Sequence, residues 1–459
     1  MKNKYISISF ICLISSVSLL FLSSCSIDPA INNSPNGISI ASLKTQEGQF
    51  GLVVALQTGT GEFYCGDRSR MSSIFTWQMS AVKGLGRPQP ITWNSYDLSL
   101  DGPVSDMWLV GFKTVRIAND ILKYSVETDF GASNIGIRAT LKGMAETYKA
   151  IVLGELAAYY GSIPITQDGF NTNPFVSQTD AYAEVQRLLD DAIIQFGNSA
   201  PIKQDLNYGG DKAKWISTCN SLKARYFLHL KNYSSALSSA KNGITDSKMS
   251  LNAMFTDAAG EQGPWAHWAK DESGEPIRGE KTFVDLLQKE AGDKRLSEYF
   301  TPNFNTTFFG NPAHKQVVTD TNATKGTNIV SLKKYAEYAD DIPLISGNEN
   351  TLIIAECEAR VGALPNAVKA VNSIRVNAGL NDMNSGDVSD KNKVITEILT
   401  QKHLSLFLEG QTYTDMRRTG TLPELAVPKR FLYPLVETNS NKTTCPKDND
   451  ALVLSLIHI

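Results

Sequence analysis

Two pairs of acidic residues are close enough along the chain to suggest the acid and base of a glycoside hydrolase. Glu356 and Glu358 are two positions apart, so a helix would point them in different directions, and Glu146 and Glu155 are more than two helical turns apart. We interpret both pairs as solvated faces of helices. The sequence also contains no HExxH, GxSxG or P-loop motif. Together these observations argue against an enzyme.

Cys25 has surroundings that predict a definite chemical modification. It follows a short cationic start and an almost wholly apolar run from residue 6 to 22, as in a secretory signal. The run ends in Leu-Ser-Ser-Cys, which resembles the lipobox of bacterial lipoproteins, where a diacylglyceryl group is attached to the cysteine sulfur. Two or more acyl chains hold a protein stably on a membrane. An ordinary signal peptide or an uncleaved anchor is the alternative interpretation.

The chain divides into three predicted segments. Residues 1–24 are expected to form the signal peptide, and residues 25–44 a flexible tether that starts at the lipidated cysteine and is rich in Asn, Ser, Pro and Gly. Residues 45–459 are expected to form a single domain, because helical-repeat bodies run longer as one unit than the usual ~150 residues.

The charge pattern and the histidines limit the partners. The formal net charge is -3, and no cluster of Lys and Arg could follow a phosphate backbone, so we expect no nucleic-acid partner. His267 and His314 each lack a second ligand at short spacing, and we therefore expect neither a metal nor another cofactor.

The cysteines outside the signal and the lipobox are scattered and form no CxxC pair, which gives no indication of zinc or thioredoxin-type chemistry. Two of them fall among apolar residues on predicted helices and are expected to be buried free thiols, although a disulfide stays open in an exported protein. The buried pair is Cys219 and Cys357, and the others are Cys65 and Cys445.

Apolar residues recur every three or four positions in several segments, which predicts helices with one buried face. Glycine, asparagine or proline follows several of these segments and ends the pattern. The predicted helices span residues 138–160, 215–230, 233–240, 353–361, 365–374 and 394–408.

Short turns at Asn232 and Gly362 join two pairs of these segments into predicted helix hairpins. Small residues such as Ala236 and Ala355 stand where two helices must approach closely, a pattern typical of tetratricopeptide-like stacking. The spacing between hairpins is irregular. We therefore predict a mostly α fold, in which tetratricopeptide-like hairpins form a single scaffold with long irregular loops.

Six segments carry motifs whose order and spacing are informative together, although none is specific alone. They run from Trp108 to Leu122, Arg138 to Pro164, Ala224 to Ala236, Asp293 to Phe300, Ile354 to Leu380 and Glu409 to Arg418. In this arrangement they resemble the SusD/RagB family, the nutrient-binding outer-membrane lipoproteins of Bacteroidetes. The chain is identified as a divergent member.

The chain departs from the family pattern at positions that usually build a buried ionic cluster. Gln401-Lys402 stands where a Glu-Arg pair is common, Ser405 where a Glu is common, and Thr412 where an Arg is common. Such clusters often contribute little net stability, so these exchanges need not cost the fold. They indicate a divergent branch with the same architecture.

The resemblance implies a binding protein and not an enzyme. A family member of this type is lipid-anchored in the outer membrane, on the cell surface, and captures an oligosaccharide or a similar nutrient, with peptides as the other ligand class. It delivers this cargo to a SusC-like TonB-dependent transporter. The alternative is a lipid-anchored helical-repeat scaffold that binds a protein or peptide partner.

Tryptophans in irregular segments are the first candidates for ligand contact, because flat aromatic faces stack on sugar C–H groups. Trp265 and Trp268 lie in a segment with Gly and Pro and no apolar periodicity, and they are the leading candidates. The interpretation that they anchor a long loop to the body is equally consistent with the sequence. Trp108 and Trp215 stand at helical spacing and are expected in the core.

A second candidate ligand patch lies in the early part of the chain, where aromatic and basic residues alternate with Gly and polar residues. Its predicted ligand contacts are Tyr64, Arg68, Arg70, Trp77 and Trp93.

Overall fold

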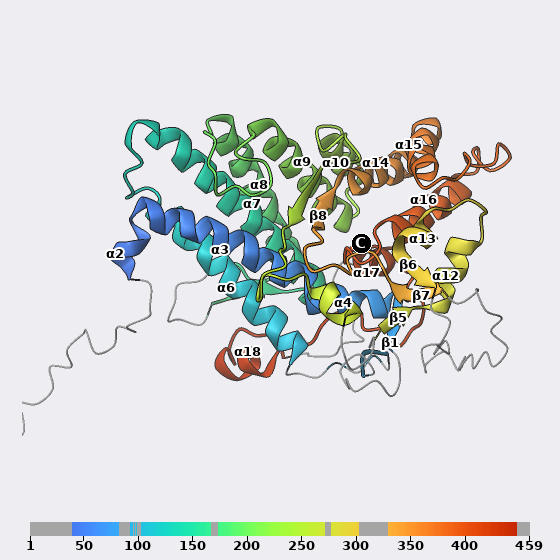
Figure 1. The fold of residues 1–459 in the computed structure, drawn as a ribbon, viewed down its shortest axis with the longest axis horizontal. Helices are drawn as coiled ribbons and strands as arrows, with labels where there is room; N and C mark the ends of the chain where they lie inside the picture. Colours follow the sequence, from blue (N-terminus) through green and yellow to red (C-terminus); the bar gives the residue numbers. More distant parts are fainter. Residues whose placement is uncertain are drawn as a thin grey trace, which may run out of the picture.

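The protein, described here by a computed structural model, is built mainly of helices that pack in an arc, with short strands and irregular connections on one side (Figure 1). The signal peptide, Cys25 and His314 lie outside the residues that the structure describes. The described residues are 39–81, 92–94, 96, 98, 102–166, 173–270, 277–302 and 329–447.

Helices that follow one another along the chain also pack against one another, and we call this part the repeat stack (Figure 1). Each helix buries an apolar face against its neighbours, as the periodicity predicts. The repeat stack consists of α7 (Asn134–Tyr160), α8 (Gln178–Gly197), α9 (Lys212–His229), α10 (Tyr233–Ala240), α14 (Gly347–Val361), α15 (Leu364–Asn377) and α16 (Lys391–Ser405).

The two predicted hairpins are confirmed as α9 with α10 and α14 with α15. The side chain of Asn232 caps α10 by accepting from the N–H of Ser235. Gly362 ends α14 with a φ of 99°, a left-handed conformation that favours glycine, and Pro365 lies in the first turn of α15. Local signals in the sequence therefore place the turns of the stack.

Helices α3 (Gln46–Cys65) and α6 (Pro103–Tyr124) pack against α7 and widen the scaffold. The hydroxyl of Thr45 caps α3 by accepting from the N–H of Gly48, so the predicted start of the folded body coincides with this cap. One turn of helix, α2 (Ile40–Leu43), lies just before it, inside the segment predicted as tether.

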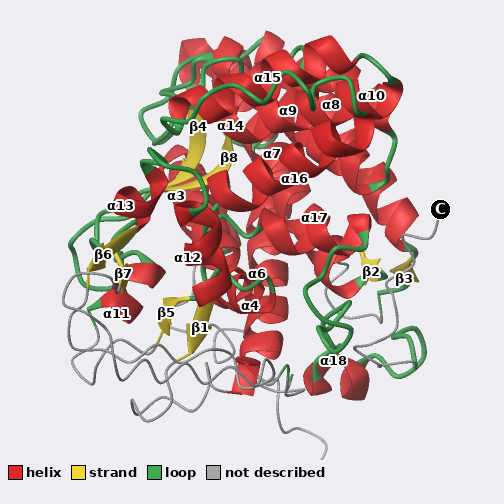
Figure 2. Ribbon diagram, turned by 90° about the vertical axis from the view of Figure 1, so that its right-hand side faces the viewer, coloured by secondary structure: helices red, strands yellow, loops and turns green. Residues whose placement is uncertain are grey.

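Shorter elements lie beside the stack, and we call them the connection region (Figure 2). In the described part of the chain, strands occur only as antiparallel pairs. The region contains α4 (Asp67–Phe75), α11 (Pro264–Ala269), α12 (Lys281–Gln288), α13 (Arg295–Tyr299), β1 (Met79–Ala81) paired with β5 (Ile277–Gly279), and β6 (Phe300–Pro302) paired with β7 (Ile329–Leu332).

The remaining elements link these parts. Strand β4 pairs with β8 in a register that sets Ser250 opposite Ser346, just before α14 begins. These elements are β2 (Ile163–Pro164) paired with β3 (Phe175–Val176), β4 (Ser250–Ala253) paired with β8 (Ile342–Ser346), the 3-10 turn η2 (Gly131–Ser133), α17 (Gln411–Thr419) and α18 (Leu435–Ser440).

The core confirms several expectations. Trp108 and Trp215 are buried, as predicted. Helices α7 and α9 approach so closely at Gly154 that a Cβ there would lie 2.4 Å from the ring of Tyr226, which explains the glycine. None of the helices in the described ranges combines the length and the apolar character that crossing a lipid bilayer demands.

All four cysteines in the described part are buried free thiols, as expected for Cys219 and Cys357. Burial raises the pKa of the Cys65, Cys219 and Cys357 thiols to about 12. These groups are therefore packing residues at neutral pH.

Candidate functional site

Three residues of the predicted early patch, Tyr64, Arg68 and Trp93, are buried in the core, which corrects the expectation that they contact a ligand. Arg68 is fully buried and donates from Nη1 to Glu155 Oε2 at 2.7 Å and to the Tyr159 hydroxyl at 3.2 Å. Its guanidinium also lies 3.7 Å from the centre of the Tyr64 ring, which is itself buried. Arg68 thus joins α4 to α7, and the hydroxyl of Tyr64 on α3 accepts from Gln411 Nε2 at 2.9 Å, so both side chains face other protein groups.

The carboxylates interpreted as solvated faces are also in the interior, so that interpretation is wrong. Glu356 is fully buried and accepts from Arg418 Nη1 at 2.7 Å and from Lys402 Nζ at 3.2 Å. Burial alone would raise the pKa of the Glu356 carboxyl, but Arg418 and Lys402 outweigh burial and hold it well below its usual range. This is a structural ion cluster with no room for a scissile bond.

The other three acidic residues of these two pairs are buried as well. Glu155 pairs with Arg68, and Glu358 is buried and pairs with Lys241 at 2.9 Å. Glu146 is buried with an unpaired Oε2, and burial raises the pKa of its carboxyl to about 7. The charge of Asp191 adds to this rise, and the burial of Glu146 keeps it from acting on a substrate at the surface.

The leading tryptophan candidates are buried, so the structure matches the anchoring interpretation and corrects the ligand-contact one. Trp265 is fully buried and Trp268 is 3% exposed. Trp268 stacks on Trp93, itself 3% exposed, with ring centres 5.6 Å apart, and Arg70 lies 4.4 Å from the Trp268 ring centre. Arg70 also donates to the carbonyl of Pro264. This packing ties α11 to the body.

Trp77 is the tryptophan candidate that keeps part of its ring at the surface. It is half-buried, and its Nε1 donates to the hydroxyl of Tyr96 at 3.0 Å. Tyr96, which the sequence reasoning missed, is also half-buried. Both residues have positive φ angles, 61° for Trp77 and 58° for Tyr96, a conformation that costs free energy in residues other than glycine. We call these two residues the aromatic pair.

The positive φ angles favour a functional interpretation of the aromatic pair. Strained backbone conformations concentrate at binding and catalytic sites, where the surrounding structure holds them. The position of Tyr96 three residues after Trp93 is the only sequence signal that could have pointed to it. Together the two rings offer a polar-edged aromatic surface, in which the Tyr96 ring packs edge-to-face on the buried Phe75 with ring centres 5.9 Å apart.

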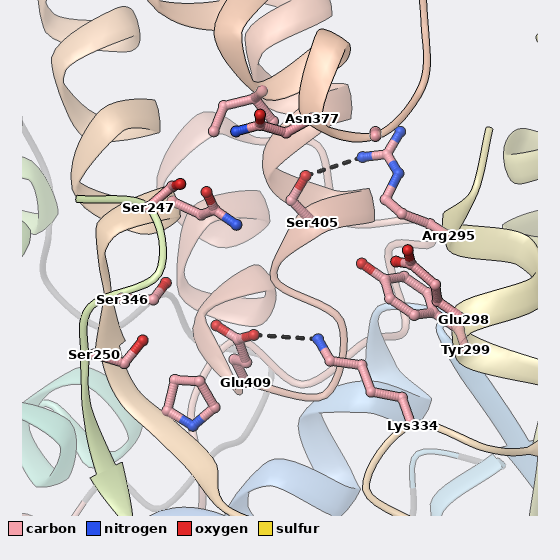
Figure 3. Close-up of a pocket in the computed structure, with 14 residues that line it drawn as sticks. Ser247, Ser250, Arg295, Glu298, Tyr299, Lys334, Ser346, Asn377, Ser405 and Glu409 are labelled. Carbon is pink, nitrogen blue, oxygen red and sulfur yellow. Dashed lines mark hydrogen bonds and ion pairs between the residues drawn. The ribbon is translucent and has the colours of Figure 1, made fainter. Parts of the chain in front are cut away.

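A pocket of about 370 Å³ opens between the repeat stack and the connection region (Figure 3). No sequence signal predicted it, because its walls come from six separate stretches of the chain. It is lined by Ser247, Ser250, Arg295, Glu298, Tyr299, Lys334, Pro343, Ser346, Asn348, Ile374, Asn377, Ala378, Ser405 and Glu409.

Ion pairs hold the charged side chains of this pocket in place. Arg295 donates from Nη2 to Asp293 at 2.7 Å. Lys334 lies 3.3 Å from Oε1 of Glu409 (Figure 3). The Tyr335 hydroxyl donates to the same oxygen at 3.2 Å. Burial raises the pKa of the Glu409 carboxyl, and Lys334 offsets part of that rise.

Metal binding has no support in the described residues, where no group of three His, Cys, Asp or Glu side chains could hold an ion. His267 is exposed and lies beside the ring of Tyr338, with ring centres 5.5 Å apart.

Comparison with known families identifies the architecture. A family model described as "Starch-binding associating with outer membrane", named SusD-like, matches residues 107–434. This range covers well over half of the sequence. The chain belongs to this family. Proteins of the SusD-like family are binding proteins that associate with the outer membrane, and they bind carbohydrate.

Solved SusD-like structures share the fold over most of both chains. A SusD/RagB family protein from Bacteroides thetaiotaomicron is 19% identical, with a TM-score of 0.65 and a match that covers 86% of this chain and 94% of that chain. A SusD homologue from Bacteroides fragilis is 17% identical, with a TM-score of 0.65 and coverage of 88% and 98%. A chitin-binding protein is 17% identical, with a TM-score of 0.65 and coverage of 86% and 95%. No curated protein sequence matches the chain.

The positions at which this SusD-like chain departs from the family pattern lie in the interior. Lys402 is buried and takes part in the Glu356 ion cluster, with Asp415 Oδ2 at 2.9 Å from its Nζ. Gln401 and Ser405 both accept from Arg295 Nη1 at 2.9 Å. The neutral side chains of Gln401 and Ser405 thus form hydrogen bonds at positions where charged residues are common, and Ser405 also lines the pocket.

Proposed function

We propose that the protein captures an oligosaccharide or a similar nutrient at the cell surface and delivers it to a SusC-like TonB-dependent transporter. The observation that carries this proposal is the match of residues 107–434 to the SusD-like family. A chitin-binding protein among the structural neighbours favours a glycan over a peptide as the ligand. The rigid repeat stack supplies a platform from which the connection region can present binding groups.

The aromatic pair is the proposed contact surface for the nutrient. Trp77 and Tyr96 are half-buried, carry hydrogen-bonding edges and stand in strained conformations that a binding role would explain. The buried Phe75 supports the Tyr96 ring from behind. In this proposal Phe75 positions the ligand-binding ring and does not touch the ligand.

A glycan titration tests this surface. Starch-derived, chitin-derived and cellulose-derived oligosaccharides are titrated into the purified full chain by calorimetry, with Trp77→Ala as the test variant. We expect at least one glycan to bind and Trp77→Ala to weaken it by about tenfold, the scale of a lost aromatic contact. Tyr233→Ala, which removes a half-buried ring in the repeat stack, is the matched control and should bind normally. Equal affinity of Trp77→Ala and the unchanged chain would contradict the assignment.

The lipid anchor rests on Cys25. We expect Cys25→Ala to release the protein into a soluble fraction or to leave its signal uncut, since the acyl chains are attached to that sulfur. Fractionation and mass spectrometry of the N-terminus measure both outcomes. Unchanged membrane retention together with normal cleavage would remove the lipoprotein proposal.

A protein-binding scaffold is the alternative, because stacks of helix hairpins often recognise peptides and proteins. Ligand binding and co-purification experiments distinguish the two functions. If broad glycan and peptide panels show no binding while a partner other than a TonB-dependent transporter co-purifies, the scaffold function is supported. Co-purification of a SusC-like transporter with a glycan-binding chain supports nutrient delivery.

A further inference from the structure

Several polar atoms that line the pocket are not used in holding the fold together. Both recorded partners of the Glu409 carboxylate, Lys334 and Tyr335, bind Oε1, which leaves Oε2 facing the pocket (Figure 3). Glu409 is only 6% exposed, so this oxygen belongs to a nearly buried acid. The Oδ1 atom of Asn348 is buried and has no partner within the described chain. Buried polar atoms without partners are rare and call for a ligand or water.

The charges around the pocket are balanced, which points to a neutral ligand. Two cationic and two anionic side chains line it. Arg295 is committed to Asp293, and Lys334 to Glu409, so a charged ligand would have to compete with an existing ion pair. A neutral molecule can instead use the free acceptors without breaking either pair.

The free groups favour a ligand with several hydroxyls. Oε2 of Glu409 and Oδ1 of Asn348 are acceptors, whereas the hydroxyl groups of Ser247, Ser250 and Tyr299 can donate or accept. Vicinal hydroxyls of a sugar ring donate and accept in the same way. At about 370 Å³ the pocket lies at the small end of the range for ligand sites and suits roughly one or two sugar rings.

We propose that this pocket is a second binding site, which takes a neutral polyhydroxylated ligand the size of one or two sugar rings through Glu409 Oε2 and Asn348 Oδ1. The site goes beyond nutrient capture at the aromatic pair, because Trp77 and Tyr96 are not among its lining residues. The ligand is either a short free sugar or one end of a longer glycan.

The pocket can be closed at its rim without disturbing the ion pairs. Asn377 is an exposed lining residue at the end of α15, and its exposed neighbour Val376 does not line the pocket. Asn377→Trp therefore blocks the opening, while Val376→Trp adds the same bulk outside it. Asn348→Leu is a second test, because it removes the free acceptor Oδ1 and keeps the side-chain size.

Calorimetric titration of the full chain uses glucose, galactose, mannose, xylose, maltose and cellobiose as probes. We expect at least one to bind, Asn377→Trp and Asn348→Leu each to weaken it by about tenfold or more, and Val376→Trp and Trp77→Ala to change it by less than about twofold. No binding of any probe would overturn the proposal. Unchanged binding in Asn377→Trp would also overturn it. Loss of short-sugar binding in Trp77→Ala would overturn it as well, because the short sugars would then bind at the aromatic pair. Tighter binding of glucosamine or glucuronate than of glucose would overturn the neutral-ligand assignment.

Maltoheptaose distinguishes the two sources of the ligand. If the pocket takes the end of a longer glycan, both Asn377→Trp and Trp77→Ala weaken maltoheptaose binding. If it takes short free sugars, Asn377→Trp weakens only the short probes. Failure of long glycans to bind at all would count against the aromatic pair and would leave the short-sugar result as an independent measure of the pocket.

Discussion

The repeat stack and the connection region are held together by different interactions. Helices of the stack are joined by buried charges, such as Arg225 with Glu349 at 2.6 Å and Lys402 with Glu356 at 3.2 Å. Elements of the connection region are tied down mainly by rings, as in the stacking of Trp93 on Trp268 and of Tyr299 on Phe407. The buried pair of Arg68 on α4 with Glu155 on α7 is an exception. Charge pairs are directional and fix one helix relative to another, whereas aromatic contacts depend mainly on buried area. The directional charge pairs fix the frame of the stack, and the ring contacts attach the connection region to the same core.

The largest expected effect comes from breaking a charge cluster of the stack. Glu356→Ala would leave Arg418 and Lys402 buried without their carboxylate. Removing one partner of a buried pair costs about 3–5 kcal/mol, and we expect a loss of that size in the free energy of unfolding, measured by urea denaturation. A loss below about 1 kcal/mol would mean that solvent reaches the cluster and that charges do not hold the stack.

Removing an aromatic anchor should cost somewhat less and should act locally. Trp268→Ala deletes the ring between Trp93 and Trp265, and core Trp→Ala changes cost about 3 kcal/mol or more. Hydrogen exchange should show loss of protection in α11 before α9. Equal loss of protection in both helices would show that the two regions are not held separately.

Glu146 tests what an unpaired charge does inside the stack. Its carboxyl has a pKa of about 7 in the fold against a usual 4.5, so the folded protein binds a proton that the unfolded chain releases. The free energy of unfolding should therefore fall as pH rises from about 4.5 to about 7, by up to about 3 kcal/mol. Glu146→Gln removes this dependence and should be the more stable protein at pH 8, while the two should be similar at pH 4. Parallel pH profiles would contradict the assignment.

The smallest effect is expected for a charge pair on the outer surface. Arg187 pairs with Glu184 at 2.7 Å on α8, and the Arg187 side chain is 56% exposed. We expect Arg187→Ala to change the free energy of unfolding by less than about 1 kcal/mol, because solvent screens exposed pairs. A thermal melt in low salt measures it. If Arg187→Ala destabilised the protein as much as Glu356→Ala, burial would not explain why the ion pairs inside the stack are strong.

The helices of the stack could be predicted because their signals are local. Asn232 and Gly362 mark the turns of two hairpins within a few residues of the helices they end. The ion clusters could not be predicted from spacing, since Arg68 reaches Glu155 from 87 positions away and Arg225 reaches Glu349 from 124. An acidic residue on a helix looks the same in a sequence whether its partner is water or a distant arginine.

The candidate site was harder to predict for the same reason. Trp265 and Trp268 lie among Gly and Pro, which suggested an exposed loop, but Pro264 starts a short helix that buries both rings. The pocket joins segments from Ser247 to Glu409, and no short motif marks it.

The four buried thiols can report local unfolding of this protein. Each sits in a different part of the chain and is buried, so a thiol-modifying reagent reaches it only when that part of the structure parts from its neighbours. Cys219 senses the α7–α9 contact through Thr147, 3.3 Å away, and Cys357 senses the packing of α14 against α9 and α10. Mass spectrometry of the labelled peptides would thus show in which order the surroundings of the four cysteines unfold, without any engineered probe.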